Sequence, residues 1–117
     1  MMSYLINFQK MDWEKPTEYI RQKTFIRDNQ RIMLAEFSEN FVDNEWCTNR
    51  HMGYVIEGSI TINFNGKLIK FKSGDGIFIP EGEDNRHKGS IAKGEKALII
   101  FYGDIRDFPK LLNTVHW

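Results

Sequence analysis

The chain has 117 residues and a formal net charge of zero, because 16 Lys and Arg residues balance 16 Asp and Glu residues. This length suits a single domain, and the neutral balance argues against nucleic acid or an anionic membrane as a partner, since both attract basic surfaces. The single cysteine, Cys47, excludes a framework of intrachain disulfides. Because residues 1–10 lack the pattern of a signal peptide and no apolar run could span a bilayer, we expect a cytoplasmic protein.

The N-terminal residues 1–23 predict an arm that leads into the fold. They are polar with isolated aromatic side chains, and Pro16 favours an extended backbone at the residue before it. The first clear strand signal is the apolar run Arg31–Phe37, which is short for a helix and typical of a strand buried on both faces. A second strand is expected around Trp46.

The middle of the chain predicts an antiparallel hairpin. Apolar and polar side chains alternate over residues 60–64, the period of a strand with one buried face. Asn65-Gly66 follows directly and predicts a type I′ turn, because both central residues of that turn need a positive φ angle. Further apolar runs at 77–79 and 97–102 stand beside turns rich in glycine or proline. Many short strands joined by tight turns predict an all-β sandwich or barrel.

The C-terminal residues change character. Phe108, Leu111, Leu112 and Val115 recur at three- and four-residue spacing, which predicts a short amphipathic helix packed on the barrel. The expected organisation is a single domain over residues 1–117, with a barrel core over about 24–102, an N-terminal arm over 1–23 and a C-terminal tail over 103–117.

Two stretches resemble the cupin superfamily. Residues 53–60, Gly-Tyr-Val-Ile-Glu-Gly-Ser-Ile, are similar to the end of the first cupin motif, and Gly74, Pro80 and Gly82 have the spacing of the second. The resemblance covers roughly residues 24–102 and implies a double-stranded β-helix, the RmlC-like jelly-roll barrel. More narrowly, Trp-Cys followed by His-Met-Gly-Tyr over residues 46–54 is similar to small one-domain bacterial cupins.

The resemblance also implies a cavity inside the barrel that commonly holds a divalent metal. Many cupins bind it with two His in an H-x-H pair, a Glu a few residues later and a third His from the second motif. In this chain the pair would fall within residues 44–47, which contain no histidine, while His51 stands at the Glu position and Asn85 at the third His position. None of the four usual ligands is kept.

The sequence nevertheless offers a rebuilt ligand set. His87 lies two residues beyond Asn85, so on a strand both side chains would face the same way, as would those of Glu45 and Cys47. His51 and His87 with Cys47 or Glu45 would supply three ligands and leave one position open, the pattern of a catalytic Zn or Fe site. Against this arrangement, two strand residues displace His87 by about 6.6 Å from Asn85, whereas a metal–nitrogen bond is about 2.1 Å.

The simpler interpretation is a pocket without strong metal dependence, in which the histidines are hydrogen-bonded and Cys47 is a small buried hydrophobe. We therefore favour a small-molecule-binding cupin of unknown substrate over the alternative, a metal-dependent cupin enzyme, an oxygenase or isomerase. Catalytic residues and cofactor stay undetermined, and Zn, Fe, Mn or Ni at the rebuilt site is the less favoured choice. The expected pocket residues are Trp46, Cys47, His51, Asn85 and His87, and the candidate metal ligands are His51, His87, Cys47 and Glu45.

Two partners are expected. One is an unidentified small molecule inside the barrel. The other is a second copy of the chain, because small cupins commonly dimerise through sheet edges and N-terminal arms and this arm carries Trp13. A twofold dimer is also the commonest symmetric assembly of soluble proteins.

Overall fold

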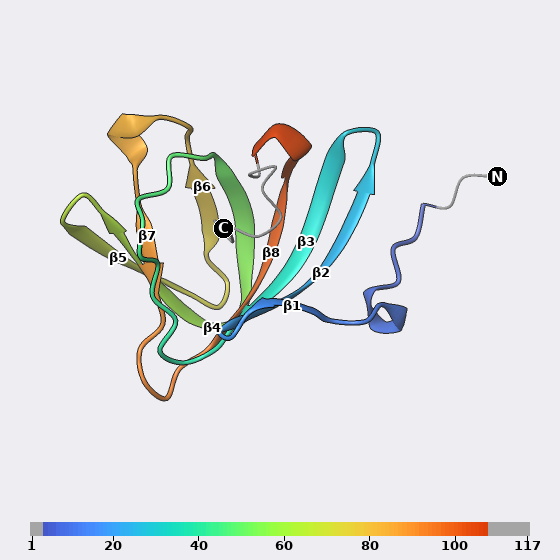
Figure 1. Ribbon diagram of the computed structural model, residues 1–117, viewed down its shortest axis with the longest axis horizontal. Helices are drawn as coiled ribbons and strands as arrows, with labels where there is room; N and C mark the ends of the chain where they lie inside the picture. Colours follow the sequence, from blue (N-terminus) through green and yellow to red (C-terminus); the bar gives the residue numbers. More distant parts are fainter. Residues whose placement is uncertain (1–3, 108–117) are drawn as a thin grey trace.

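The computed structural model describes residues 4–107, and the prediction of an all-β structure is confirmed for them (Figure 1). The helical segments in this range are single 3-10 turns, none of which has the length and apolar character of a membrane-crossing helix. The amphipathic helix expected between Phe108 and Val115 lies outside the described residues. In chain order the elements are η1 (Phe8–Lys10), β1 (Glu14–Thr17), β2 (Ile20–Arg27), β3 (Gln30–Phe37), β4 (His51–Phe64), β5 (Lys67–Lys72), β6 (Gly76–Ile79), η2 (Glu83–Asn85), β7 (Lys88–Ser90), β8 (Ala97–Asp104) and η3 (Ile105–Asp107).

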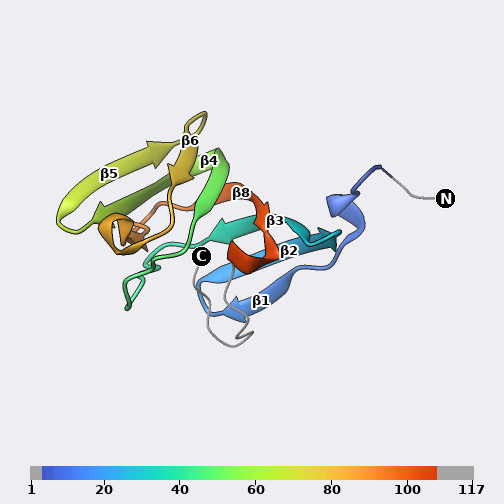
Figure 2. The ribbon, with the colours of Figure 1, turned by 90° about the horizontal axis from the view of Figure 1, so that it is seen from above.

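The long strand β4 joins two antiparallel sheets. Its first half pairs with β6 on one side and with β8 on the other, and β8 continues through β3 and β2 to β1. Its second half, from Ser59, pairs with β5 and with β7. The larger sheet therefore has the order β1-β2-β3-β8-β4-β6 and the smaller sheet the order β5-β4-β7. The two views in Figures 1 and 2 show these sheets curling around a common interior.

A bulge in β4 allows one strand to serve both sheets. The pairing with β8 shifts register between Val55 and Glu57, and Gly58 follows with a φ angle of +76°. A Cβ atom on Gly58 would overlap the carbonyl oxygen of Lys96, so this position requires glycine. The extra residue reverses the alternation of side chains, with the result that Val55 before the bulge and Ile60 after it are both buried.

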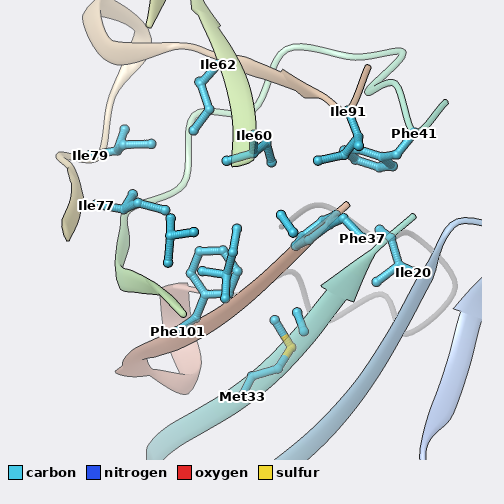
Figure 3. Packing of buried hydrophobic residues seen from close by; sticks show 14 residues of the cluster. Ile20, Met33, Phe37, Phe41, Ile60, Ile62, Ile77, Ile79, Ile91 and Phe101 are labelled. Atoms are coloured by element: carbon cyan, nitrogen blue, oxygen red, sulfur yellow. The ribbon is translucent and has the colours of Figure 1, made fainter. Parts of the chain in front are cut away.

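The interior between the sheets is filled by aliphatic and phenyl side chains. Figure 3 shows Phe37 and Phe101 of the larger sheet facing Ile60 of the other half of the barrel. Burial of each such side chain contributes about 1.5–3 kcal/mol. The full cluster is Ile20, Met33, Ala35, Phe37, Phe41, Val55, Ile60, Ile62, Ile77, Ile79, Ile91, Ala97, Ile99 and Phe101.

Strand β3 differs from the expectation of burial on both faces. Met33, Ala35 and Phe37 are buried, whereas Ile32 and Leu34 on the opposite face are only half-buried. The sequence of β3 is continuously apolar because both of its faces carry hydrophobic side chains. One face lines the core, and the other is the outer surface of the sheet.

The sheet also begins earlier than expected. Residues 14–17 and 20–27 form β1 and β2. Strand β1 pairs with β2, and β2, which begins inside the expected arm, pairs with β3 across the register Ile20↔Phe37 to Arg27↔Gln30. Ile20 is buried in the core, and one core hydrophobe in a largely polar segment gives little periodic signal.

The turn at Asn65-Gly66 is confirmed by its geometry. Asn65 and Gly66 have φ angles of +53° and +103°, and Phe64 pairs with Lys67 across them, as a two-residue type I′ turn requires. The strand expected around Trp46, in contrast, is not formed. The segment between β3 and β4 makes two isolated bridges to the region of β7, Val42↔Ser90 and Cys47↔His87.

Candidate metal centre

His51 is the first residue of β4 and faces the barrel interior. It shares the inward side of the strand with Val55, because the two are four residues apart and the bulge comes after them. Its partner on β6 is Ile79, which is also buried. The His51 side chain is therefore held inside, with 2% of its surface exposed.

Cys47 and His87 reach the same interior as a cross-strand pair. The Cys47 N–H donates to the His87 carbonyl at 2.9 Å, and the His87 N–H donates to the Cys47 carbonyl at 3.0 Å. In an antiparallel pair that exchanges both hydrogen bonds, the two side chains lie on the same face. Both are buried, with 4% of Cys47 and 0% of His87 exposed.

The three side chains converge on one point. The Cys47 Sγ and His51 Nε2 atoms are 3.5 Å apart, and the His51 and His87 rings meet edge to face with centroids 4.9 Å apart. One ligand atom from each of Cys47, His51 and His87 lies within 4.8 Å of the others. Within residues 4–107 this is the one group of three or more such side chains with metal-binding geometry.

The donor set and its spacing fit a divalent transition metal. Tetrahedral zinc, with Zn–S of about 2.3 Å and Zn–N of about 2.0–2.1 Å, separates a sulfur from a nitrogen ligand by about 3.6 Å. The 3.5 Å between Cys47 Sγ and His51 Nε2 matches this value, and the three ligand atoms all lie within 4.8 Å of one another. A thiolate with two imidazoles is a ligand set that suits zinc or iron.

The backbone of Asn85 orients the imidazole of His87. His87 Nδ1 lies 3.0 Å from the Asn85 carbonyl oxygen, which can only accept, so Nδ1 carries the proton and Nε2 carries the lone pair. Burial lowers the pKa of His87 below its ordinary value of 6.5, against the opposite effect of this hydrogen bond. His87 is therefore a neutral imidazole at neutral pH, the form that binds metals.

Burial also determines the state of Cys47 before any metal binds. The pKa of the Cys47 thiol is raised above its ordinary value of 9.0, chiefly because burial disfavours the thiolate, while a hydrogen bond from the Asn49 backbone acts in the opposite direction. The side chain is thus a thiol at neutral pH. A metal would have to displace this proton, so metal binding would release one proton.

Trp46 and Glu45 lie outside this cluster. Trp46 lies at the protein surface. The charged groups of Arg86 and Lys88 lie 5.0 and 4.6 Å from the centroid of its ring. Glu45 is exposed as well. The expectation that Glu45 and Cys47 share a face fails because the backbone bends at Glu45 and leaves the regular alternation of a strand.

Asn85 also differs from its expected position. It ends the 3-10 turn η2 and not a strand, so it does not share a face with His87. Its side-chain amide contacts the Glu81 carbonyl at 3.5 Å, and its own carbonyl meets His87. The 6.6 Å displacement expected between Asn85 and His87 therefore does not weigh against the site, because Asn85 contributes no side-chain ligand.

Comparison with known proteins identifies the family of this chain. Its sequence matches the family model described as ethanolamine utilisation protein EutQ over residues 2–103. The chain belongs to the EutQ family. No curated protein sequence matches it significantly.

Solved structures place this EutQ-family chain among the cupins. The polyketide cyclase RemF from Streptomyces resistomycificus has a TM-score of 0.75 at 19% identity, over 89% of this chain and 80% of that one. An RmlC-like cupin from Shewanella frigidimarina has a TM-score of 0.67 at 16% identity, over 86% and 91%. The Clostridium difficile EutQ protein has a TM-score of 0.60 at 16% identity, over 86% and 75%. The cupin barrel implied by the two motifs is thereby confirmed.

Two neighbours of the cluster were not singled out from the sequence of this EutQ-family chain. The Phe64 ring lies 6.0 Å from His87 and the Phe101 ring 5.9 Å from His51, so aromatic walls bound the cluster. The inward period of residues 60–64 was a signal for Phe64, because it continues the face of Ile60 and Ile62. The contact of His87 with the Asn85 backbone has no sequence signal.

Proposed function

We propose that this cupin binds one divalent transition-metal ion, zinc or iron, through Cys47, His51 and His87, and binds a small molecule at the ion. The observation that carries the proposal is the convergence of the three donors within 4.8 Å in a chain that lacks the usual cupin ligands. Three protein ligands leave a position for substrate or water, which distinguishes a catalytic metal site from a closed structural one. The favoured assignment is therefore a metal-dependent cupin enzyme and not a metal-free pocket.

The residues of the chain would divide the work at this site. Cys47, His51 and His87 hold the ion, while the Asn85 carbonyl keeps the lone pair of His87 on Nε2. The bound ion supplies Lewis-acid chemistry, which polarises a coordinated oxygen. Phe64 and Phe101 border the imidazoles and keep water from the site, which strengthens electrostatic interactions there.

The relatives support small-molecule metabolism as the setting. The family description refers to ethanolamine utilisation, and RemF is named a polyketide cyclase, so cupins of this shape include enzymes. The likeness to RemF, at 19% identity, supports a shared fold and not a shared substrate. We propose the same general setting for this chain.

The proposal is tested by metal content and thermal stability together. Protein purified without added metal should contain about one zinc or iron per chain, and chelation should lower its melting temperature. At a free metal concentration about 100 times the Kd, binding adds about 2.7 kcal/mol, which corresponds to roughly 10 °C or more for a domain of this size. Cys47→Ser and His87→Gln should each abolish the chelator-sensitive part of the stability.

Asn85→Ala is the matched control for these variants. It stands at a usual cupin ligand position, but its contact with His87 is made by the backbone, so metal content should be unchanged. Loss of metal in Asn85→Ala with retention in Cys47→Ser would contradict the assignment of ligands.

A metal-free pocket is the second candidate function. The observation in its favour is the 3.5 Å contact between Cys47 Sγ and His51 Nε2, which a neutral thiol and an imidazole can make without an ion. The same measurements separate the two candidates. Metal-free protein whose melting temperature is insensitive to zinc, iron and chelator would favour the metal-free pocket.

A further inference from the structure

The outer face of the larger sheet carries a cavity that is separate from the metal site. Ile20 is buried in the core, so the next residue of β2, Arg21, points outward. Glu36 of β3 lies opposite Arg21 and points the same way. The cavity at this place has a volume of about 420 Å³, within the range of small-molecule sites. Its lining residues are Trp13, Lys15, Glu18, Tyr19, Ile20, Arg21, Glu36 and Ser38.

The cavity lies far from the metal site. The strand register pairs Glu36 with Leu98 of β8, and Leu98 with Glu57 of β4. Glu57 comes six residues after His51, which corresponds to about 20 Å along the strand. The metal site is also inside the barrel, whereas the cavity opens on the outer surface. A ligand in the cavity would therefore not touch the ion, and the two proposals can fail separately.

Arg21, Glu36 and Trp13 form a fixed polar surface in the cavity. Arg21 Nε donates to Glu36 Oε1 at 2.7 Å, and Arg21 Nη2 donates to Glu36 Oε2 at 3.2 Å, so the two side chains form a planar pair with two hydrogen bonds. The Trp13 ring lies against two cations, with 4.2 Å from its centroid to the Arg21 guanidinium carbon and 4.7 Å to Lys23 Nζ. Lys23 Nζ in turn donates to the Phe8 carbonyl at 2.7 Å. Trp13 is half-buried, so part of its ring stays accessible in the cavity.

The charged side chains of the cavity have both signs in equal number. Lys15 and Arg21 are positive, and Glu18 and Glu36 are negative. Lys15 and Glu18 form no ion pair within residues 4–107, so both are available to a ligand. A cavity without net charge gives no net attraction to an anion or a cation. A hydroxyl group, in contrast, can donate to a carboxylate and accept from a guanidinium or an ammonium group.

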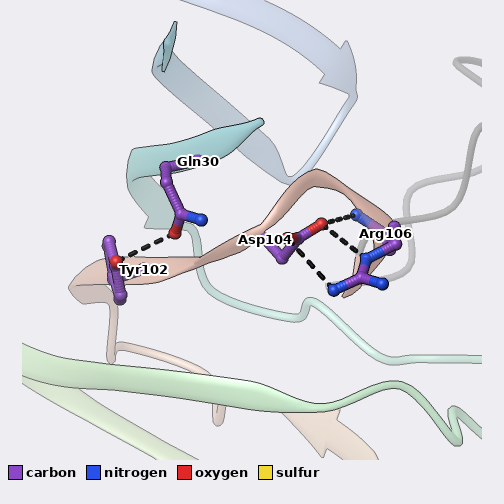
Figure 4. A network of polar contacts seen from close by, with 4 residues as sticks. All are labelled: Gln30, Tyr102, Asp104 and Arg106. Atoms are coloured by element: carbon purple, nitrogen blue, oxygen red, sulfur yellow. Dashed lines mark hydrogen bonds and ion pairs between the residues drawn. The ribbon is translucent and has the colours of Figure 1, made fainter. Parts of the chain in front are cut away.

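Another surface cavity differs in size and in its polar groups. It has a volume of about 230 Å³ and lies at the other end of the β2–β3 pair, beside Gln30 and Tyr102. Tyr102 Oη donates to Gln30 Oε1 at 2.9 Å, and nearby Asp104 is paired with Arg106 (Figure 4). Polar side chains that bond to one another offer fewer groups to a ligand. The larger cavity is therefore the stronger candidate for a ligand site.

We propose that the larger cavity binds a neutral sugar, whose ring packs on Trp13 and whose hydroxyl groups bond to Arg21 and Glu36. The C–H groups of a pyranose ring form an apolar face that suits an indole, while the hydroxyl groups at its rim reach charged side chains. Tyr19, which is 38% exposed, adds a second aromatic surface to the same cavity. This site goes beyond the metal-dependent function and does not rest on it.

The test adds methyl β-D-glucopyranoside to the full chain and follows the indole N–H signals by NMR spectroscopy. The chain has three tryptophans, so the Trp13 signal is assigned by its absence in Trp13→Phe. This signal should shift in a saturable way, with a Kd in the millimolar range that suits so small a ligand. The signal of Trp46 should not move, because Trp46 does not line the cavity.

Variants separate recognition of the sugar from an effect on the fold. Glu36→Gln keeps the shape of the side chain and removes its charge, and it should weaken binding about 10-fold. Trp13→Ala should abolish binding, followed through the backbone N–H signal of Arg21. Trp46→Ala is the matched control, because Trp46 also lies against two cations at the surface, and it should bind the sugar as wild type does. A dispersed amide spectrum shows that each variant is folded.

Several results would overturn the inference. One is a Trp13 signal that does not respond to the glucoside at concentrations well above the millimolar range, and another is unchanged binding in Glu36→Gln. Tighter binding of glycine than of the glucoside would assign the charged side chains to a zwitterion and not to a sugar. Equally tight binding of cyclohexanol, which has a ring but a single hydroxyl group, would show that the cavity recognises apolar surface alone.

Discussion

Cys47 and His87 are joined by two reciprocal backbone hydrogen bonds, although they lie in segments far apart in the sequence. This single antiparallel bridge turns both side chains toward His51 at the start of β4. The candidate metal centre therefore depends on the backbone of a segment that is otherwise irregular. Its geometry is set by the barrel and not by a local sequence motif.

The bulge in β4 gives a sharp test of the fold. Gly58→Ala introduces a Cβ against the Lys96 carbonyl at a φ angle of +76°, and we expect a loss of about 3 kcal/mol or more in the free energy of unfolding. Gly94→Ala is the matched control, because its φ angle is +81° and no atom lies within 4 Å of an added Cβ. It should cost only about 1 kcal/mol. Urea unfolding measures both, and equal losses would contradict the steric argument.

The carboxylate of Glu95 predicts a pH-dependent contribution to stability. Ser59 Oγ donates to it and Lys70 lies 3.2 Å away, and these contacts lower the pKa of Glu95 below its ordinary value of 4.5. Since the folded-state pKa is the lower one, the contribution is present above pH 4.5 and is lost as the pH falls further. Glu95→Gln should therefore be less stable than wild type at neutral pH. Unfolding at several pH values should show this difference shrinking below pH 4.5, and a constant difference would contradict the prediction.

The outer face of the larger sheet carries an apolar row that predicts self-association. Phe78 and Tyr102 flank Met52 across β6, β4 and β8, and 72% of Phe78 and 47% of Tyr102 are exposed. The register extends the row to Ile32 of β3 and Phe25 of β2. An apolar surface that crosses five neighbouring strands is typical of a protein–protein interface. We expect a second copy of the chain to cover it.

Light scattering coupled to size exclusion tests this prediction. Wild type should be a dimer, and Phe78→Lys should shift it to the monomer. Leu68→Lys is the control, because Leu68 is 66% exposed on β5 of the smaller sheet, away from the row. A monomeric wild type, or a dimer that Leu68→Lys disrupts and Phe78→Lys does not, would show that this face is not the interface.

The sequence predicted the barrel well, because its signals are local. The Asn65-Gly66 turn and the alternation through Phe64 depend on neighbouring residues and are found as expected. The inward placement of His51 required the position of the bulge, which the sequence does not reveal. Simple alternation from Cys47 would have placed Glu45 in the pocket, but the bend at Glu45 removes it.

The sequence identified the residues of the candidate site but not their convergence. Cys47, His51 and His87 were candidates from the sequence, but their spacing gave no reason to expect a shared point. That point is created by long-range pairing, Cys47 with His87 and β4 with β6 and β8.

X-ray absorption at the edge of the bound metal tests the central claim most directly. For protein purified without added metal, we predict one sulfur ligand at about 2.3 Å and at least two nitrogen ligands at about 2.0–2.1 Å. The sulfur shell should disappear in Cys47→Ser that has been reloaded with the same metal. A metal shell made only of nitrogen and oxygen in wild type, or protein that takes up no metal, would contradict the account.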